Sequence, residues 1–171
     1  MLQLQDLPTT STLRRFAARY PDADIDAVLQ FLTVLRIGTD LSNALDAFLD
    51  QRHGLLQGRW WVLILLMREE DLTSSPSELA AKAGVTRATM TGLLEGLMRE
   101  RLVERLADAT DGRRYRVRLT AEGQAKLDVV MPDYYRRVKE LMLAVPAERR
   151  SALVDDLRRL KQSARLFTDP A

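Results

Sequence analysis

The region from Ser75 to Arg101 constrains the fold more strongly than any other part of the chain. Ser75 is followed by a proline and then by Glu78, a combination that is typical of a capped helix start. Gly84 favours a tight turn, because glycine adopts positive φ angles without strain. Thr86 can then cap a second helix. The pattern therefore predicts two short helices joined by a glycine turn.

The second of these helices is amphipathic. Its apolar residues recur at helical spacing and are predicted to point inward: Met90, Leu93, Leu94 and Leu97. The opposite phase is predicted to face outward and holds Arg87, Thr91, Gly92 and Glu95. Gly92 and Gly96 each cost on the order of 1 kcal/mol of helix stability relative to alanine, so they require a specific reason.

Two alternating segments follow and predict a β-hairpin. They span 102–106 and 114–119, and the turn between them is Asp108–Gly112. In the second segment Tyr115, Val117 and Leu119 share one face, while Arg114, Arg116 and Arg118 share the other.

Two short helices followed by an arginine-tipped hairpin make a winged helix-turn-helix. Such a unit places one helix in the major groove of DNA and the hairpin against the backbone or minor groove. The predicted partner is therefore double-stranded DNA.

Most of the remaining chain has helical periodicity. A long helix is predicted from Asp24 to the His53-Gly54 pair, and shorter helices at 11–20, capped by Ser11, and at 60–68, which is apolar on nearly all sides. Leu72-Thr73 can form a minimal strand. Thr120 can cap a helix over 121–144 that contains Pro132, and Pro146 begins a last helix. The expected fold class is mainly α with a small β-hairpin wing (α+β), a winged helix-turn-helix domain with N- and C-terminal dimerisation helices.

The apolar stripes at Ile25–Leu49 and Leu153–Leu160 exceed what one small winged helix can cover. We therefore expect a homodimer. The expected division is 1–54 for N-terminal dimerisation helices, 55–120 for the DNA-binding lobe and 121–171 for C-terminal dimerisation helices.

Composition narrows the alternatives. The chain has no cysteine and one histidine, which excludes disulfides, thiolate metal sites and thiol-based sensing. We expect no metal and no cofactor. No apolar run is long enough to span a membrane and no signal peptide is recognisable, so a cytoplasmic protein without a membrane partner is expected. The residues show no catalytic constellation, and an enzyme is not predicted.

The order of these elements resembles the MarR family of bacterial transcription regulators. The most specific match is residues 111–123, where Asp111-Gly112-Arg113 is followed by a short alternating strand and then by Leu119-Thr120-Ala121-Glu122-Gly123. Further matches are Ser77-Glu78-Leu79-Ala80, Leu102-Val103-Glu104-Arg105 and Arg59-Trp60-Trp61-Val62-Leu63. The resemblance implies a homodimer whose terminal helices form the interface and whose winged helices face a palindromic operator. It also implies repression that is relieved by a small aromatic or phenolic anion.

Candidate DNA-binding residues lie at the helix starts and the hairpin tip: Ser75, Ser77, Thr86, Arg87, Thr89, Thr91, Arg113 and Arg114. Arg113 is predicted to enter a narrow minor groove, since such grooves have an enhanced negative potential. Asp111 either orients Arg113 or is an ordinary turn residue. Trp61 and His53 are the candidate ligand-binding residues, with the pocket expected near Trp61, between its helix and the dimerisation helices.

Two residues depart from the family pattern. Gly92 stands where many recognition helices carry arginine, and Trp61 stands where urate-responsive relatives carry an acid, which argues against a urate response. The glycines leave open an alternative, a winged-helix interaction or structural module without operator-specific DNA binding. Salt-dependent binding to random duplex DNA discriminates between the two.

Overall fold

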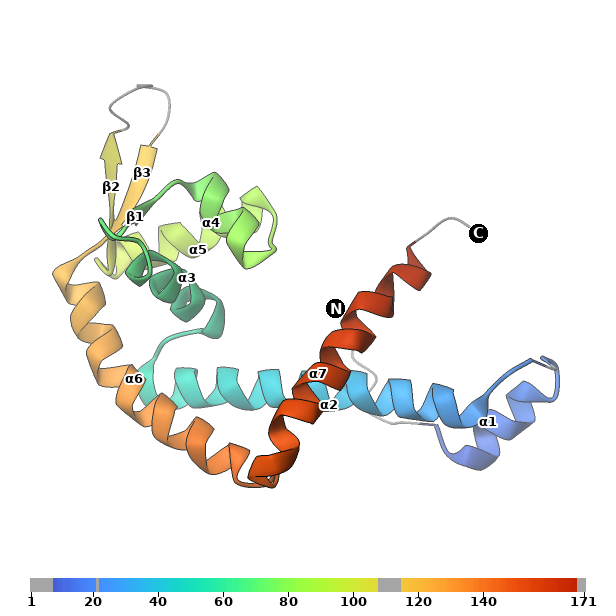
Figure 1. Ribbon diagram of the computed structural model, residues 1–171. Coiled ribbons are helices and arrows are strands. Elements are labelled where there is room, and N and C mark those ends of the chain that lie inside the picture. Colours follow the sequence, from blue (N-terminus) through green and yellow to red (C-terminus); the bar gives the residue numbers. More distant parts are fainter. Residues whose placement is uncertain (1–7, 21, 108–114, 169–171) are drawn as a thin grey trace. The chain divides into compact units, whose positions relative to one another are not determined.

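The computed structural model describes residues 8–20, 22–107 and 115–168. It is mainly helical, with one small antiparallel sheet (Figure 1). The predicted fold class is therefore confirmed. The chain forms two compact units that divide between Gln124 and Ala125, near the start of helix α6.

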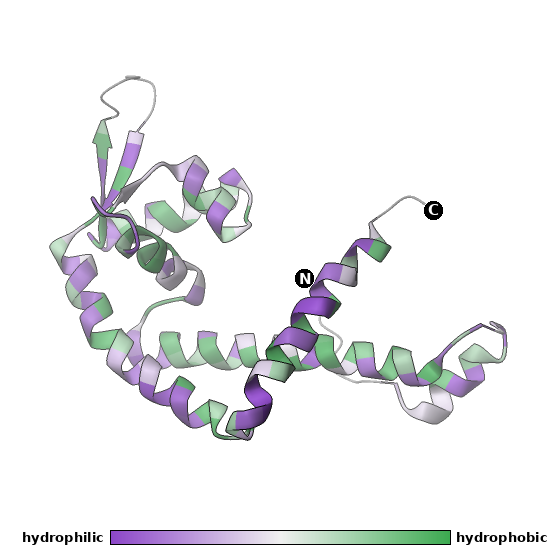
Figure 2. Ribbon diagram, in the orientation of Figure 1, coloured by the Kyte–Doolittle hydropathy of each residue, from purple (hydrophilic) through white to green (hydrophobic). Residues whose placement is uncertain are grey.

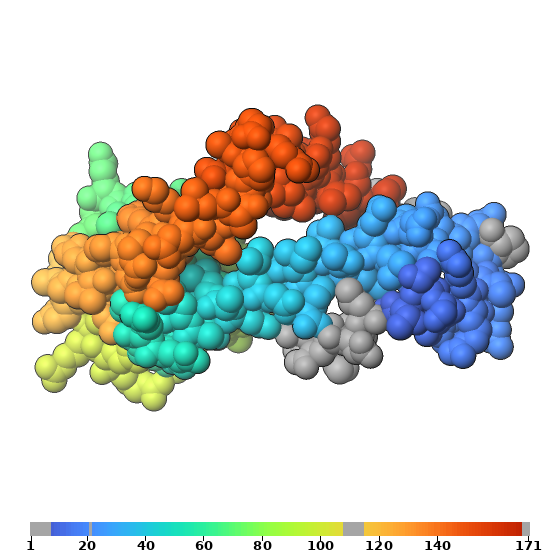
Figure 3. All heavy atoms as spheres, turned by 90° about the horizontal axis from the view of Figure 1, so that it is seen from below, coloured from blue at the N-terminus to red at the C-terminus, as the bar shows by residue number. Residues whose placement is uncertain are grey.

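Two helices form the N-terminal part of the first unit. Helix α1 (Thr10–Ala17) lies against the N-terminal end of α2 (Ile25–His53), as Figure 3 shows. The prediction of the long helix and its ends is confirmed: Asp24 caps it and Gly54 ends it with a φ of +56°. The predicted helix at 11–20 was wrong at both ends. The hydroxyl of Thr9 accepts the N–H of Thr12 at 3.2 Å, so the cap lies before Ser11.

Helix α3 (Gln57–Met67) is the centre of the core, with Trp60, Val62, Leu63 and Leu66 buried. It begins three residues before the predicted 60–68, because the backbone N–H of Gln57 donates to the carboxylate of Asp46 at 2.9 Å. The apolar character that the sequence shows on nearly all sides of this helix does not mean that every side is covered. Trp61 is 43% exposed, so one side of α3 is open.

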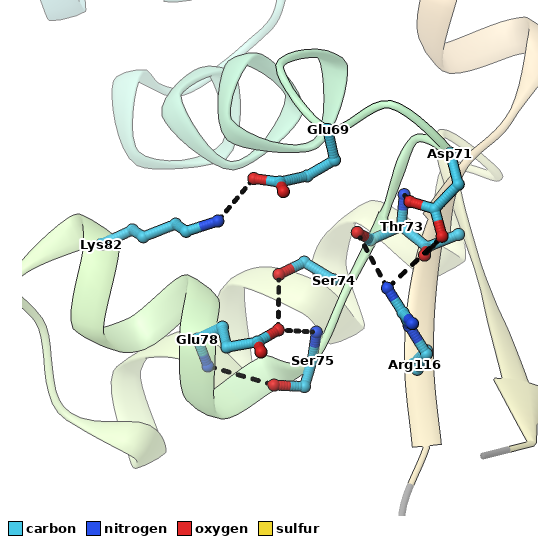
Figure 4. Close-up of polar contacts among 8 residues, drawn as sticks. All are labelled: Glu69, Asp71, Thr73, Ser74, Ser75, Glu78, Lys82 and Arg116. Carbon is cyan, nitrogen blue, oxygen red and sulfur yellow. Dashed lines mark hydrogen bonds and ion pairs between the residues drawn. The ribbon is translucent and has the colours of Figure 1, made fainter. Parts of the chain in front are cut away.

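The helix-turn-helix has the predicted form. Helix α4 (Pro76–Ala83) ends at Gly84, which has a φ of +67°, and α5 (Arg87–Arg99) begins after the cap Thr86. The hydroxyl of Ser75 accepts the N–H of Glu78 at 3.2 Å, and the N–H of Ser75 donates to the Glu78 carboxylate at 3.0 Å (Figure 4). The inner face of α5 is buried at Met90, Leu94 and Leu97, with Leu93 half-buried.

The sheet has three strands in the order β1-β3-β2, all antiparallel. They are β1 (Thr73–Ser74), β2 (Val103–Ala107) and β3 (Tyr115–Leu119). Strands β1 and β2 begin one residue later than predicted, because the preceding residues, Leu72 and Arg101-Leu102, belong to turns in which Leu72 and Arg101 have positive φ. Val117 and Leu119 are buried on the predicted face of β3.

The second unit consists of most of α6 (Ala121–Met142), then α7 (Ala147–Ser163) and the short helix η1 (Ala164–Phe167). The hydroxyl of Thr120 accepts the N–H of Gly123 at 3.0 Å, as expected for a cap. Helix α6 ends two residues before the predicted Ala144. The apolar stripe of α7 is exposed in the single chain: Leu153, Val154, Leu157 and Leu160.

Apolar side chains remain at the surface of both units. Green segments in Figure 2 recur along α2 and α7. Among the described helices, none combines the length and the hydropathy that a membrane span requires.

Candidate nucleic-acid interface

The first turns of α5 bring four predicted DNA-binding residues together at the surface. Thr86, Arg87, Thr89 and Thr91 are all exposed. The hydroxyl of Thr86 accepts the N–H of Thr89 at 3.1 Å and lies 2.9 Å from the Thr89 hydroxyl. The hydroxyl of Thr91 donates to the carbonyl of Arg87 at 2.9 Å. These bonds hold the threonine side chains in fixed positions around Arg87.

The outward face of α5 carries mainly small side chains between two charged residues. Its exposed residues are Arg87, Ala88, Thr91, Gly92 and Glu95. A Cβ at Gly92 would meet nothing within 4 Å, so packing inside the domain does not require a glycine there. Small side chains between Arg87 and Glu95 allow a close approach of the helix backbone to another surface.

The start of α4 supplies the other two predicted serines, and they differ in role. Ser75 is half-buried and its hydroxyl is engaged in the cap, whereas Ser77 is exposed on the first turn. The backbone and hydroxyl hydrogen bonds of Ser75, with a further bond from the Ser74 hydroxyl at 3.1 Å, hold the pKa of Glu78 below its ordinary value. An ionised Glu78 therefore keeps this helix start ordered at neutral pH.

Two arginines on the wing strand β3 each form an ion pair with an acidic residue. Arg118 lies opposite Glu104, with Nε 2.8 Å from Oε1. Nη2 of Arg116 lies 3.3 Å from the carbonyl of Thr73 and 3.4 Å from the carboxylate of Asp71 (Figure 4). These contacts join β3 to both of its neighbours. The hairpin turn with Asp111, Arg113 and Arg114 lies outside the described residues.

Asp71, in the turn before β1, is the carboxylate that Arg116 of the wing contacts. Its carboxylate accepts the hydroxyl and the N–H of Thr73. These bonds, and the charge of Arg116, hold the pKa of Asp71 below its ordinary value.

A pocket of about 310 Å³ lies at the open side of α3. It is lined by residues of α3, α4, α5 and the turn between the last two: Gly58, Trp61, Ile64, Leu65, Arg68, Lys82, Ala83, Val85 and Leu93. Nζ of Lys82 lies 2.5 Å from the carboxylate of Glu69, and Arg68 is exposed. The pocket thus combines an indole and aliphatic side chains with two cations.

The two predicted ligand residues do not share this pocket. His53 is the last residue of α2, and its ring packs edge-on against Phe48 at a centroid distance of 5.3 Å. It is absent from the residues that line the pocket at Trp61, whose described walls also include no residue of α2. The expected position of the pocket, against the dimerisation helices, therefore differs from the pocket that the single chain forms.

One contact of the domain went unpredicted. The guanidinium of Arg59 on α3 forms an ion pair with Glu100, the residue that ends α5, and it lies over Gly96. The signal in the sequence was Gly96 itself, a glycine inside a helix. Nothing local to Arg59 or Glu100 indicates that the two residues meet.

Within the ranges that the structure describes, no group of three or more histidine, aspartate or glutamate side chains is placed to hold a metal ion.

Comparison with known proteins finds relatives that are all transcription regulators. The sequence model of the MarR family matches residues 53–114. The chain is 30% identical over 168 residues to the HTH-type transcriptional repressor YetL of Bacillus subtilis, which covers 98% of this chain and 100% of that protein. It is 27% identical over 109 residues to the homoprotocatechuate degradative operon repressor of Escherichia coli, 62% of this chain and 72% of that protein. The structure of the M. tuberculosis regulator MosR with DNA matches at 32% identity and a TM-score of 0.63, over 79% of this chain and 95% of that one.

Proposed function

Because the chain belongs to the MarR family of DNA-binding transcription regulators, which are not enzymes, we propose that it is a repressor. In this proposal a homodimer binds a palindromic operator and leaves it when a small aromatic or phenolic anion binds. The observation that carries the proposal is the exposed cluster of Thr86, Arg87, Thr89 and Thr91 at the start of α5, since recognition helices read bases with their N-terminal residues.

The DNA contact is divided between three elements. Arg87 and the threonines around it enter the major groove, and Ser77 at the exposed start of α4 contacts a phosphate. The hairpin tip reaches the flanking minor groove through Arg113, with Arg114 beside it. A protein 32% identical to this chain, MosR, has been solved in complex with DNA, which supports DNA binding by this fold.

The dimer is supported by apolar side chains that the single chain leaves at its surface. On α2, Phe31, Leu35 and Leu41 are each exposed by 42–52%. Leu153, Val154, Leu157 and Leu160 are exposed on α7. Exposed apolar surface of this kind is typical of protein interfaces. We therefore assign residues 1–54 and 121–171 to dimerisation and residues 55–120 to DNA binding. A two-fold dimer predicts half-sites about one helical turn apart.

The effector is proposed to bind at Trp61. The pocket there offers apolar walls and an indole for an aromatic ring, and the exposed Arg68 for a carboxylate, while Lys82 in the same wall is paired with Glu69. A relative regulates an operon that degrades homoprotocatechuate, a phenolic acid, which supports the class of ligand. His53, away from this pocket, has no role in the proposal.

Selection from random duplexes tests the DNA part. We expect two-fold symmetric sites, bound with an affinity that falls steeply with salt because arginines displace condensed counterions. A promoter that carries the selected site should be transcribed less in the presence of the protein. Recovery of only non-palindromic sites, or of none, would contradict the proposal and favour the alternative of an interaction module.

A further inference from the structure

Helices α3 and α5 cross closely because each supplies a glycine where the other inserts a side chain. A Cβ added at Gly58 of α3 would lie 3.1 Å from Cδ2 of Leu93. A Cβ added at Gly96 of α5 would lie 2.5–2.7 Å from three atoms of the Arg59 guanidinium. Gly96 is buried beneath that group. The glycine that weakens α5 as a helix thus makes room for a cation from α3.

Arg59 also reaches the end of α5. Its Nη1 donates to the carboxylate of Glu100, which follows the last residue of the helix. The side chain of Arg59 is only 21% exposed, so the guanidinium is partly shielded from solvent. One guanidinium therefore contacts α5 at two places, the backbone at Gly96 and the carboxylate at Glu100.

We propose that Arg59 is a positioning residue for operator recognition, which holds the C-terminal end of α5 so that its N-terminal turns point correctly into the groove. The inference rests on the proposed function. Helix α5 has 13 residues and is about 20 Å long at its ordinary rise. Arg87 lies nine residues, or about 13 Å, from Gly96, so a tilt of about 5° at the Gly96 end displaces Arg87 by roughly 1 Å, which is more than a base contact tolerates. Because Gly96 has no side chain, Arg59 can lie against the helix at this position.

Substitution of Glu100 by glutamine separates this role from simple electrostatics. The variant loses one negative charge, so an effect of charge alone would strengthen binding to DNA. Positioning predicts the opposite sign, a loss of about 5- to 10-fold in operator affinity, while affinity for random duplex stays the same or rises. Glu70→Gln is the matched control, because Glu70 is exposed near the other end of α3 and the substitution removes the same charge.

Arg59→Ala and Gly96→Ala test the two other members of the contact. Arg59→Ala should weaken operator binding by a similar factor without changing the salt dependence, whereas loss of a direct phosphate contact would lower the slope by about one. Gly96→Ala should displace the guanidinium and reproduce the loss. The Glu100→Gln and Gly96→Ala substitutions together should be no worse than either alone, because both remove the same interaction. Thermal unfolding of each variant shows whether the fold persists, and Glu100→Gln, which adds no volume, carries the test if Gly96→Ala unfolds.

The outcomes are distinguishable. Glu100→Gln protein that binds the operator as tightly as the wild type or the Glu70→Gln variant overturns the inference alone. Additive losses in the double variant also overturn it. Wild-type protein that binds no two-fold site overturns the proposed function, and the inference with it.

Discussion

The carboxylate of Asp71 accepts two hydrogen bonds from Thr73, one from its hydroxyl at 2.6 Å and one from its backbone N–H at 3.0 Å. This pair fixes the turn that leads into β1. Because Arg116 of β3 also points to Asp71, the same carboxylate connects the turn before β1 with the wing (Figure 4).

The pair predicts a pH dependence of stability. The pKa of Asp71 in the folded protein lies below its ordinary value of 3.8, chiefly because of the Thr73 hydroxyl. Its contribution is therefore fully present above the ordinary pKa and is lost as pH falls through the folded pKa. In urea unfolding followed by circular dichroism, Asp71→Asn should have a lower midpoint than wild type by a constant amount from pH 7 to about pH 5. The gap should shrink in more acidic solution. Glu70→Gln, at the neighbouring position, should show no such gap. A gap for Asp71→Asn that stays the same size as the pH falls below the ordinary pKa of Asp71 would contradict the assignment.

Arg113 carries the sharpest prediction that comes from the sequence, since the structure does not describe it. Arg113→Ala should cost roughly 1–3 kcal/mol of operator affinity and leave fold and dimer intact. The loss should be larger on operators with A·T flanks, where the minor groove is narrow, than on G·C flanks. Titration of labelled duplexes measures both. Arg149→Ala, at an exposed position on the first turn of α7, is the control, and equal losses for the two variants would show diffuse charge instead of a wing contact.

Dimer formation depends on the apolar side chains of α2. Leu35 is 52% exposed in the single chain, so Leu35→Glu should place a charge in the proposed interface and cause dissociation or unfolding. Light scattering at micromolar concentration should show a dimer for the wild type. Gln51→Glu adds the same charge at an exposed position near the end of α2 and should remain dimeric. A folded wild-type monomer would refute the proposed dimer.

Trp61 provides a spectroscopic test of the proposed effector site. An aromatic carboxylate bound beside this exposed indole should change tryptophan fluorescence and weaken DNA binding. Trp61→Ala should abolish the response and keep DNA binding, while the buried Trp60 continues to report on the fold. Arg68→Gln should weaken the response to carboxylates more than to neutral phenols. If a broad panel of aromatic acids changes neither signal, the ligand-sensing part of the proposal is wrong.

Gly123 and Gly92 should respond to alanine in opposite directions. A Cβ at Gly123 would collide with the backbone carbonyl of Leu102, which cannot move as a side chain can, so Gly123→Ala should destabilise the fold by roughly 1–3 kcal/mol. A Cβ at Gly92 meets empty space, and Gly92→Ala should stabilise by about 0.5–1 kcal/mol through helix propensity. Chemical unfolding measures both changes. Two shifts of the same sign would contradict this assignment of the glycines.

Local interactions explain what the sequence predicted well. The cap at Ser75 and the turn at Gly84 depend on residues within a few positions of each other, and both are confirmed. Helix α3 begins at Gln57 because of Asp46, a residue of another helix, so its start could not be read from local pattern. For the same reason the contact of Arg59 with Glu100 was not predictable, nor was the fact that α4 and α5 form the walls of the pocket at Trp61, since each needs the packing of α3 against α4 or α5.

In the described part of the chain, many cations already lie against a carboxylate of the same protein: Arg36, Arg59, Lys82, Arg116, Arg118, Arg136, Arg137, Arg158 and Arg159. Such internal neutralisation leaves fewer charges to attract the polyphosphate of an arbitrary chromosomal segment. Since a genome offers about 10⁶ or more competing sites, weak retention on bulk DNA keeps a larger share of the molecules free to search. Fewer copies of such a regulator should therefore suffice to occupy a target site than of a protein whose cations are mostly unpaired.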